Sequence, residues 1–225
     1  MSFRRIAGYA VVTAILVSPS WAAPSVTVTE TYDGLLAEAS WRVADFDVIA
    51  PTSGSPGAYL NVTGLDTFGP RIFTVPGLDQ KFVGNYRSLG VTSLGVDVQL
   101  FSIQFQIGAR PISLYLTSNN DTPEDPFDDC EAVYVSPKNV PKVGTGWKSV
   151  DVKVPSQSTT LPNGWVIVGE CGGVSPDEAW NSVITHVTGA SFYFGEPDFF
   201  YIFQVWDVGF DNPRITLRPG VTEPL

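Results

Sequence analysis

The chain has 225 residues, of which 44% are hydrophobic and 16% charged, and it carries 21 Gly, 18 Pro and a formal net charge of -10. Such a low charged fraction with so many turn formers excludes a charged helical bundle and a disordered acidic tail, and favours a turn-rich β protein. Because 23 acidic residues outnumber 13 basic ones, we expect no nucleic-acid partner, since phosphate binding requires clustered Lys and Arg.

Residues 1–22 are typical of a secretory signal peptide. Arg4 and Arg5 form a positive start, an apolar stretch follows, and Ala22 closes a small-residue cleavage site. The apolar stretch is shorter than the ~20 residues that cross a bilayer, so a membrane anchor is the weaker alternative. Cleavage would leave a single domain at 23–225 with a net charge of -12, because two arginines are removed. We therefore predict a secreted or periplasmic/extracellular protein with no membrane insertion after cleavage.

Short runs of alternating apolar residues recur along the mature chain and predict about eleven strands. The runs cover 26–29, 41–49, 71–75, 96–107, 112–116, 132–136, 147–154, 165–168, 190–194, 199–208 and 214–217. Strands in this number are enough for two sheets packed face to face. The predicted fold class is therefore all-β, an antiparallel two-sheet β-sandwich.

One pair of acids within the predicted strand 41–49 has the spacing of a catalytic pair. Asp45 and Asp47 flank Phe46, and side chains two residues apart on a strand face the same side of the sheet. Two carboxylates sharing a groove are what glycosidases use. Two acids on a solvent-facing strand are the more ordinary arrangement, so an enzyme stays an alternative.

The strongest charged feature is the run from Asp121 to Glu131, which holds six acids in eleven residues. These charges repel one another unless solvent or a cation intervenes, and carboxylate oxygens on a loop suit calcium. A hydrated loop without metal is the alternative, because the spacing is not that of an EF-hand. The predicted ligands for a structural calcium within this run are Asp121, Glu124, Asp125, Asp128 and Asp129.

Cys130 and Cys171 are the only two cysteines. In an oxidising compartment a single disulfide between them is the simplest interpretation. Two free buried thiols are the alternative, and a metal site is disfavoured because the chain has one histidine.

One segment has helical rather than strand spacing. Ser175 offers an N-cap, Pro176 suits the first helical position, and an acid follows three residues after the cap. These signals predict a short amphipathic helix near 176–187, ended by Gly189, that plugs one end of the sandwich. His186 would lie away from its apolar stripe, which favours an inert surface residue over a catalytic one.

Aromatic side chains are the other candidates for ligand-binding residues. The mature chain holds five tryptophans and an aromatic run at 199–203, and the tryptophans are Trp41, Trp147, Trp165, Trp180 and Trp206. Exposed rings can stack on sugars, but most of these lie within apolar strand patterns and are expected in the core.

The order of several short motifs resembles a known family. Residues 82–86 precede a long strand at 94–98, Gly146-Trp147 opens another strand, the helix around Trp180 leads into 190–194, and 210–212 precede a last strand. This order resembles the laminin B (laminin IV type A) domain and its exported bacterial relatives with a galactose-binding-like jelly roll. The resemblance implies an extracellular, non-catalytic jelly roll in a class where carbohydrate binding and structural calcium both occur. It places Asp211 and Asn212 at an acidic turn before the last strand, either as a turn or as further cation ligands.

The leading hypothesis is an exported, non-catalytic binding module that recognises a carbohydrate or a cell-surface polymer through a sheet face or an edge loop. A β-sandwich glycosidase or polysaccharide lyase is the enzyme alternative. A purely structural surface or envelope protein is the third. A groove with two carboxylates, one of raised pKa, would favour the enzyme. The sequence does not identify ligand-binding residues.

Overall fold

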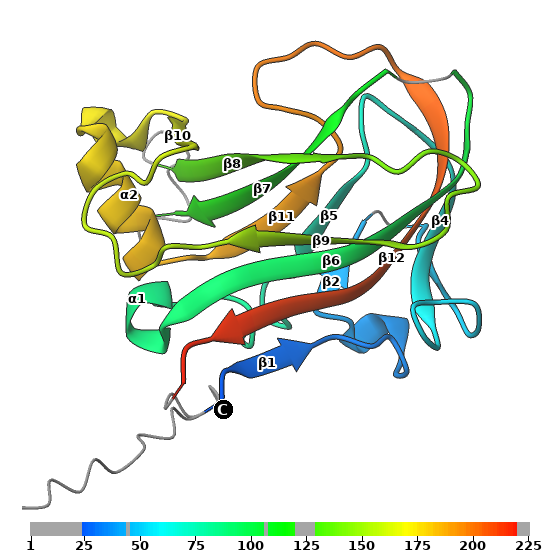
Figure 1. Ribbon diagram of the computed structural model, residues 1–225, viewed down its shortest axis with the longest axis horizontal. Coiled ribbons are helices and arrows are strands. Elements are labelled where there is room, and N and C mark those ends of the chain that lie inside the picture. Colours follow the sequence, from blue (N-terminus) through cyan, green and yellow to red (C-terminus); the bar gives the residue numbers. More distant parts are fainter. Residues whose placement is uncertain (1–23, 44–45, 106–107, 120–128, 220–225) are drawn as a thin grey trace, which may run out of the picture.

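The computed structural model describes residues 24–43, 46–105, 108–119 and 129–219. Two six-stranded antiparallel sheets pack face to face, as predicted (Figure 1). Sheet A has the order β3-β4-β12-β6-β9, with β1 also paired to β12. Its strands are β1 (Val26–Thr29), β3 (Val48–Ala50), β4 (Tyr59–Thr67), β6 (Val91–Ile103), β9 (Lys148–Lys153) and β12 (Gln204–Leu217).

Sheet B has the order β10-β8-β7-β11-β5-β2. Its strands are β2 (Trp41–Arg42), β5 (Arg71–Thr74), β7 (Pro111–Ser118), β8 (Cys130–Asn139), β10 (Trp165–Val168) and β11 (Gly189–Tyr193). One edge of sheet A is β9 and one edge of sheet B is β10. These two edge strands border a cleft between the sheets.

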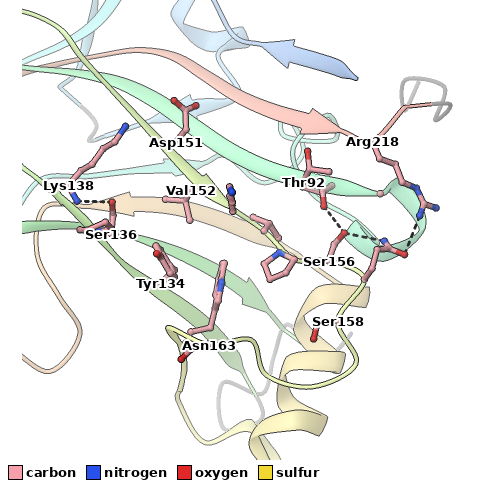
Figure 2. A pocket seen from close by; sticks show the side chains of 18 residues that line it. Thr92, Tyr134, Ser136, Lys138, Asp151, Val152, Ser156, Ser158, Asn163 and Arg218 are labelled. Carbon is pink, nitrogen blue, oxygen red and sulfur yellow. Dashed lines mark hydrogen bonds between the residues drawn. The ribbon is translucent and has the colours of Figure 1, made fainter. Parts of the chain in front are cut away.

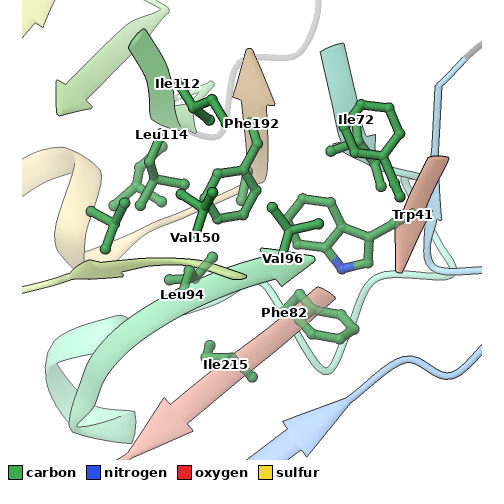
Figure 3. Close-up of a cluster of buried hydrophobic side chains, with 14 of the residues drawn as sticks. Trp41, Ile72, Phe82, Leu94, Val96, Ile112, Leu114, Val150, Phe192 and Ile215 are labelled. Atoms are coloured by element: carbon green, nitrogen blue, oxygen red, sulfur yellow. The ribbon is translucent and has the colours of Figure 1, made fainter. Parts of the chain in front are cut away.

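The core fills the space between the sheets because every second residue of the long strands is apolar and points inward. Val96 and Val150 enter from sheet A, and Ile72, Leu114 and Phe192 enter from sheet B (Figure 3). Trp41 is fully buried among them. Its ring packs edge-on to Phe82 at 5.4 Å and tilted against Phe192 at 6.1 Å between centroids. Burying side chains of this size contributes about 2–3 kcal/mol each, so the core is the main stabilising element.

Helix α2 (Pro176–Thr185) covers one end of the sandwich and packs against β7, β8 and β10 (Figure 1). The predicted N-terminus is confirmed: the Ser175 hydroxyl accepts a hydrogen bond from the Glu178 N–H, and the Glu178 carboxylate accepts one from the Ser175 N–H. The helix ends at Thr185, close to the predicted boundary, with His186 as its C-cap, whereas Gly189 begins β11 and does not end the helix. The remaining helical turns are η1 (Leu36–Glu38), α1 (Tyr86–Leu89) and η2 (Cys171–Gly173).

Three strand predictions need correction. The run 41–49 is not one strand but two short ones, β2 and β3, in different sheets. The runs 199–208 and 214–217 belong to one strand, β12, which begins only at Gln204 and continues through a bulge where Asn212 has a φ of 47°. Residues 199–203 form a loop instead. β4 was not predicted, because its outward side chains are polar and Gly64 interrupts its alternation.

The predicted disulfide is present between Cys130 and Cys171. It joins the start of β8 to the η2 turn that follows β10. The bond therefore ties together the outer strands of sheet B beside α2. In the described part of the chain, no helix is both long and apolar enough to cross a membrane.

Candidate functional site: a cleft between the sheet edges

A cleft of about 670 Å³ opens where β9 of sheet A faces β8 and β10 of sheet B (Figure 2). It exists because β10 is short. β10 pairs with β8 only from Glu131 to Tyr134, so the rest of β8 runs along the cleft without a neighbour on that side. Ser136, Pro137 and Lys138 of this free stretch line the cleft. The volume lies within the usual range of sites for small ligands.

The floor of the cleft is apolar and aromatic. Tyr134 and Trp165 lie with ring centroids 5.6 Å apart and planes tilted by 43°. Trp165 is almost fully buried, whereas Tyr134 is partly exposed. Gly164 leaves room for the tyrosine, since a Cβ there would lie 3.1 Å from its ring and the φ of 85° disfavours other residues. Val152 of β9 completes the opposite wall.

Hydroxyl and amide groups surround this floor. Ser156 donates from Oγ to the Val91 carbonyl at 2.6 Å, and Thr92 donates from Oγ1 to the Thr216 carbonyl at 3.0 Å. Ser136 accepts at Oγ from the Lys138 N–H at 3.1 Å. Ser136 and Ser156 are buried, and Ser156 Oγ also accepts from Gln157 Nε2 at 3.2 Å. The exposed Thr92 hydroxyl keeps lone pairs for a ligand, and the exposed Asn163 side chain offers both donor and acceptor. An apolar ring face edged by such groups matches the apolar face and hydroxyl rim of a sugar.

The charged residues lining the cleft are Lys138, Lys153, Arg218 and Asp151. The Asp151 carboxylate forms an ion pair with Arg214, at 2.7 Å between Oδ1 and Nη2. Among the described residues the cleft thus has a single carboxylate, and that group already has a cationic partner. The paired-carboxylate arrangement of a glycosidase does not occur among these lining residues.

The acids first considered for catalysis lie elsewhere. Asp45 lies outside the described residues. Asp47 is buried in the turn between β2 and β3, not on an outward strand face. Its carboxylate pairs with Arg42 and accepts the Val43 N–H at 2.7 Å. Asp47 therefore closes a turn, which corrects the prediction that it faces a groove.

The structure separates the described residues of the predicted calcium set. Asp121, Glu124, Asp125 and Asp128 lie outside the described residues. Asp129 directly precedes β8 of sheet B, whereas Asp211 and Asn212 lie in β12 of sheet A. The described residues contain no group of three or more acids, histidines or cysteines placed to hold a metal ion. Calcium binding by the acidic run stays a prediction.

Asp211 and Asn212 belong to a closed network on the outer face of sheet A, which we call the bulge network: Asp97, Ser149, Asp211, Asn212 and Arg214. They do not form a turn before the last strand, as the resemblance implied, but a bulge inside it. The Asp211 carboxylate accepts the Ser55 N–H at 2.6 Å and the Asn212 N–H at 2.8 Å. Asp97 accepts from Ser149 Oγ at 2.6 Å, Arg214 Nη1 at 3.0 Å and Asn212 Nδ2 at 3.0 Å.

The pKa values of the two acids of the bulge network are shifted in opposite directions. Burial, together with the charges of Asp97 and Asp33, raises the pKa of Asp211 above its ordinary value. Burial also acts to raise the pKa of Asp97, but hydrogen bonds from Ser149 and Asn212 and the charge of Arg214 outweigh it and lower that pKa. A raised and a lowered carboxyl pKa are what a catalytic pair needs. Here both carboxylates are buried and hydrogen-bonded by the protein, which identifies them as structural.

The remaining sequence candidates are distributed between core and surface. Trp41, Trp180 and Trp206 are fully buried, as expected for core residues. Trp147 is partly exposed and packs against Tyr59 at 5.2 Å on the outer face of sheet A. His186 caps the C-terminal end of α2 and does not line the cleft.

The aromatic run 199–203 differs from the core expectation, because four of its five side chains are largely exposed. The most exposed is Phe200, at 78%. Its ring contacts Phe68, at 5.3 Å between centroids.

Sequence reasoning missed the cleft itself. Its lining comes from four separate segments, 90–92, 134–138, 151–165 and Arg218, and serines and lysines in edge strands are ordinary surface residues. The one available signal was Pro137 within an otherwise regular strand, because proline in a strand marks an edge.

No family model matches the chain, and no curated protein matches it. Among solved structures, the fold is similar to the L4b domain of human laminin alpha-2, with a TM-score of 0.40 and 8% identity over 90% of this chain and 95% of that one. It is also similar to a family 30 carbohydrate-binding module of a cellulosomal cellulase of Clostridium thermocellum, with a TM-score of 0.39 and 16% identity over 87% and 94%.

A third similar structure is SGBP-B from a xyloglucan utilization locus in Bacteroides uniformis, with a TM-score of 0.30 and 14% identity over 88% of this chain and 46% of that one. These similarities concern the two-sheet sandwich alone, and they assign neither a site nor a ligand to this chain.

Proposed function

We propose that the protein is an exported, non-catalytic module that binds carbohydrate in the cleft between β8, β9 and β10. The observation that carries the proposal is the partly exposed Tyr134 ring on an apolar floor, with the exposed Thr92 hydroxyl and Asn163 amide among the residues that line the same cleft. An aromatic face buries the C–H face of a sugar while the rim exchanges hydrogen bonds with its hydroxyls. The disulfide supports the exported part of the proposal, since such bonds persist in oxidising compartments.

The enzyme alternative is less well supported by this site. The only carboxylate lining the described cleft is Asp151, which pairs with Arg214. General acid and base chemistry on a glycosidic bond requires two carboxyl groups on opposite sides of that bond. Binding without cleavage is therefore the function we assign.

The test uses oxidised protein beginning at Ala23 on an array of glycans and polysaccharides, with calcium and with chelator, followed by analysis for released sugars. Binding without products is the expected result. Released products would establish an enzyme, and the absence of both binding and products would leave a structural surface protein. Thermal melts in millimolar calcium and in chelator test the calcium prediction, because a ligand of the native state alone raises stability.

A pair of matched variants places the binding in the cleft. Tyr134→Ala removes the floor ring and is expected to weaken glycan binding about 10-fold, a loss of about 1.4 kcal/mol. Phe73→Ala removes an exposed ring from the outer face of the same sheet and is expected to leave binding unchanged. Circular dichroism checks that both variants are folded. If both then bind glycan with equal affinity, the binding site does not lie in this cleft.

A further inference from the structure

The electrostatic character of the cleft is opposite to that of the whole chain. The formal net charge of the chain is -10. Among the residues lining the cleft, however, Lys138, Lys153 and Arg218 are cationic and Asp151 alone is anionic. The Asp151 carboxylate pairs with Arg214 at 2.7 Å, a guanidinium that it shares with Asp97, and the three lining cations outnumber it. The cleft is thus a locally positive site on an acidic protein.

Two of these cations lie at opposite ends of the cleft, with Val152 between them (Figure 2). Lys138 Nζ donates to the Ser149 carbonyl at 2.9 Å, which holds the lysine of β8 across the opening toward β9. Arg218 Nη1 donates to Gln157 Oε1 at 3.3 Å at the other end. An ammonium has three N–H donors and a guanidinium five. Each group makes a single side-chain hydrogen bond within the described residues, so donors remain for a ligand.

Arg218 is positioned by backbone as well as by its side-chain partner. Its N–H donates to the Gly90 carbonyl at 2.8 Å. Its side chain lies so close over Gly90 that a Cβ there would come within 2.6 Å of it. The Arg218 side chain therefore loses less conformational entropy when its guanidinium binds a ligand, and the resulting hydrogen bond contributes more to the affinity.

We propose that the cleft selects anionic saccharides, in which carboxylate or sulfate groups on successive sugars meet Lys138 at one end and Arg218 at the other while the Tyr134 ring supports the sugar between. This inference rests on the proposed carbohydrate-binding function and names its ligand class. Guanidinium and ammonium groups form strong hydrogen bonds with carboxylate and with sulfate, so carboxylated and sulfated saccharides would be recognised in the same way. Because the net negative charge of the protein repels polyanions at a distance, the selectivity must arise from contacts inside the cleft.

The test compares matched ligands by isothermal titration at 150 mM salt. One pair is tetragalacturonate and its neutral methyl ester, and the other is a chondroitin sulfate tetrasaccharide and its desulfated, carboxyl-reduced counterpart. At least one anionic ligand is expected to bind about 10-fold more tightly than its neutral partner, and the pair that shows this separates carboxylate from sulfate recognition. Neutral ligands that bind as tightly as anionic ones would overturn the inference and leave carbohydrate binding intact. No binding by any of the four would overturn the inference, and the array described above decides separately whether the chain binds carbohydrate.

Charge-removing variants test the assignment to these residues. Lys138→Gln together with Arg218→Gln is expected to abolish the preference by lowering affinity for the anionic ligand about 10-fold, to that of the neutral partner. Both side chains are exposed, so the variant should fold, and its melting temperature checks this. Lys81→Gln removes an exposed cation that does not line the cleft and is expected to keep the preference. A preference that survives in the double variant would overturn the assignment.

Discussion

The bulge network and the cleft are two polar regions that both include residues of β9, and they use their polar groups differently. In the bulge network, Asp97 and Asp211 are buried and their oxygens accept hydrogen bonds from backbone and side chains of the same domain. In the cleft, the hydroxyl and cationic groups use only part of their hydrogen-bonding capacity within the protein, and they line an open volume. Buried acids that are fully hydrogen-bonded stabilise a fold, whereas partly engaged groups around an apolar floor can bind a ligand.

Loss of the disulfide is expected to have the largest effect, because it ties the wall of the cleft to the domain. Replacing both cysteines with serine opens a loop whose ends are 41 residues apart in sequence. The free energy of unfolding should fall by about 4 kcal/mol in the chain-entropy model. Urea denaturation of the variant and of the oxidised wild type measures the difference. Alkylation of both thiols in unreduced wild-type protein would contradict the bond itself.

Asp211→Ala should have the next largest effect and distinguishes the bulge network from the cleft. It leaves the N–H groups of Ser55 and Asn212 without their acceptor, which costs about 3 kcal/mol of stability. Asp66→Ala, an exposed acid of β4, is the matched control and should change little. Glycan affinity of the folded fraction should be unchanged. A stability loss no greater than that of the control would mean that Asp211 is not structural.

Asp97→Asn is expected to lower stability by about 2 kcal/mol at neutral pH, and this loss should depend on pH. The pKa of Asp97 is lower in the folded than in the unfolded chain, so its stabilisation is complete above the ordinary carboxyl pKa of about 4 and disappears as pH falls through the folded value. Wild type and variant should therefore converge below about pH 4 in urea denaturation. The raised pKa of Asp211 acts in the opposite direction. Burial, its largest cause, is present in both proteins, and the variant removes only the smaller contribution of the Asp97 charge. A difference that grows on acidification would contradict the assigned sign.

Asn163→Ala tests the rim of the cleft. The side chain is exposed, so stability should hold, while loss of one or two hydrogen bonds to a sugar should weaken glycan affinity about 5-fold. Titration with the best array ligand measures this change. Asn61→Ala, on a strand of sheet A away from the cleft, is the control. Equal affinities of the two variants would place the ligand elsewhere.

Phe200→Ser should have the smallest effect on the folded state. Its ring is 78% exposed, so the free energy of unfolding should change by less than about 0.5 kcal/mol. Chemical denaturation provides the measurement. A loss above about 2 kcal/mol would show that the 199–203 loop is packed rather than exposed.

Much of the fold could be predicted from sequence because it depends on local patterns. Alternation in β1 and β10 and the Ser175 capping box are properties of neighbouring residues, and those elements are present as expected. The apolar run 199–203 predicts a strand but forms a loop, because periodicity reports hydrophobicity and not whether a partner strand lies alongside.

The cleft could not be predicted for a different reason. It is a gap produced by the four-residue length of β10 and by the separation of two sheet edges. Its residues share a location in space but no spacing along the chain. The structural roles of Asp47 and Asp211 could not be predicted either. The sequence shows a carboxylate but does not show that backbone N–H groups donate hydrogen bonds to it.

The position of β12 in sheet A has a consequence for the order of events during synthesis. This strand, at Gln204–Leu217, pairs with β1, β4 and β6, all of which end at or before Ile103. Contacts of such large sequence separation form slowly, and these cannot form until β12 has been synthesised. Until then the earlier strands of sheet A have unpaired edges, which can pair wrongly or bind a chaperone. Sheet A is therefore completed late, and the domain folds as a whole rather than strand by strand.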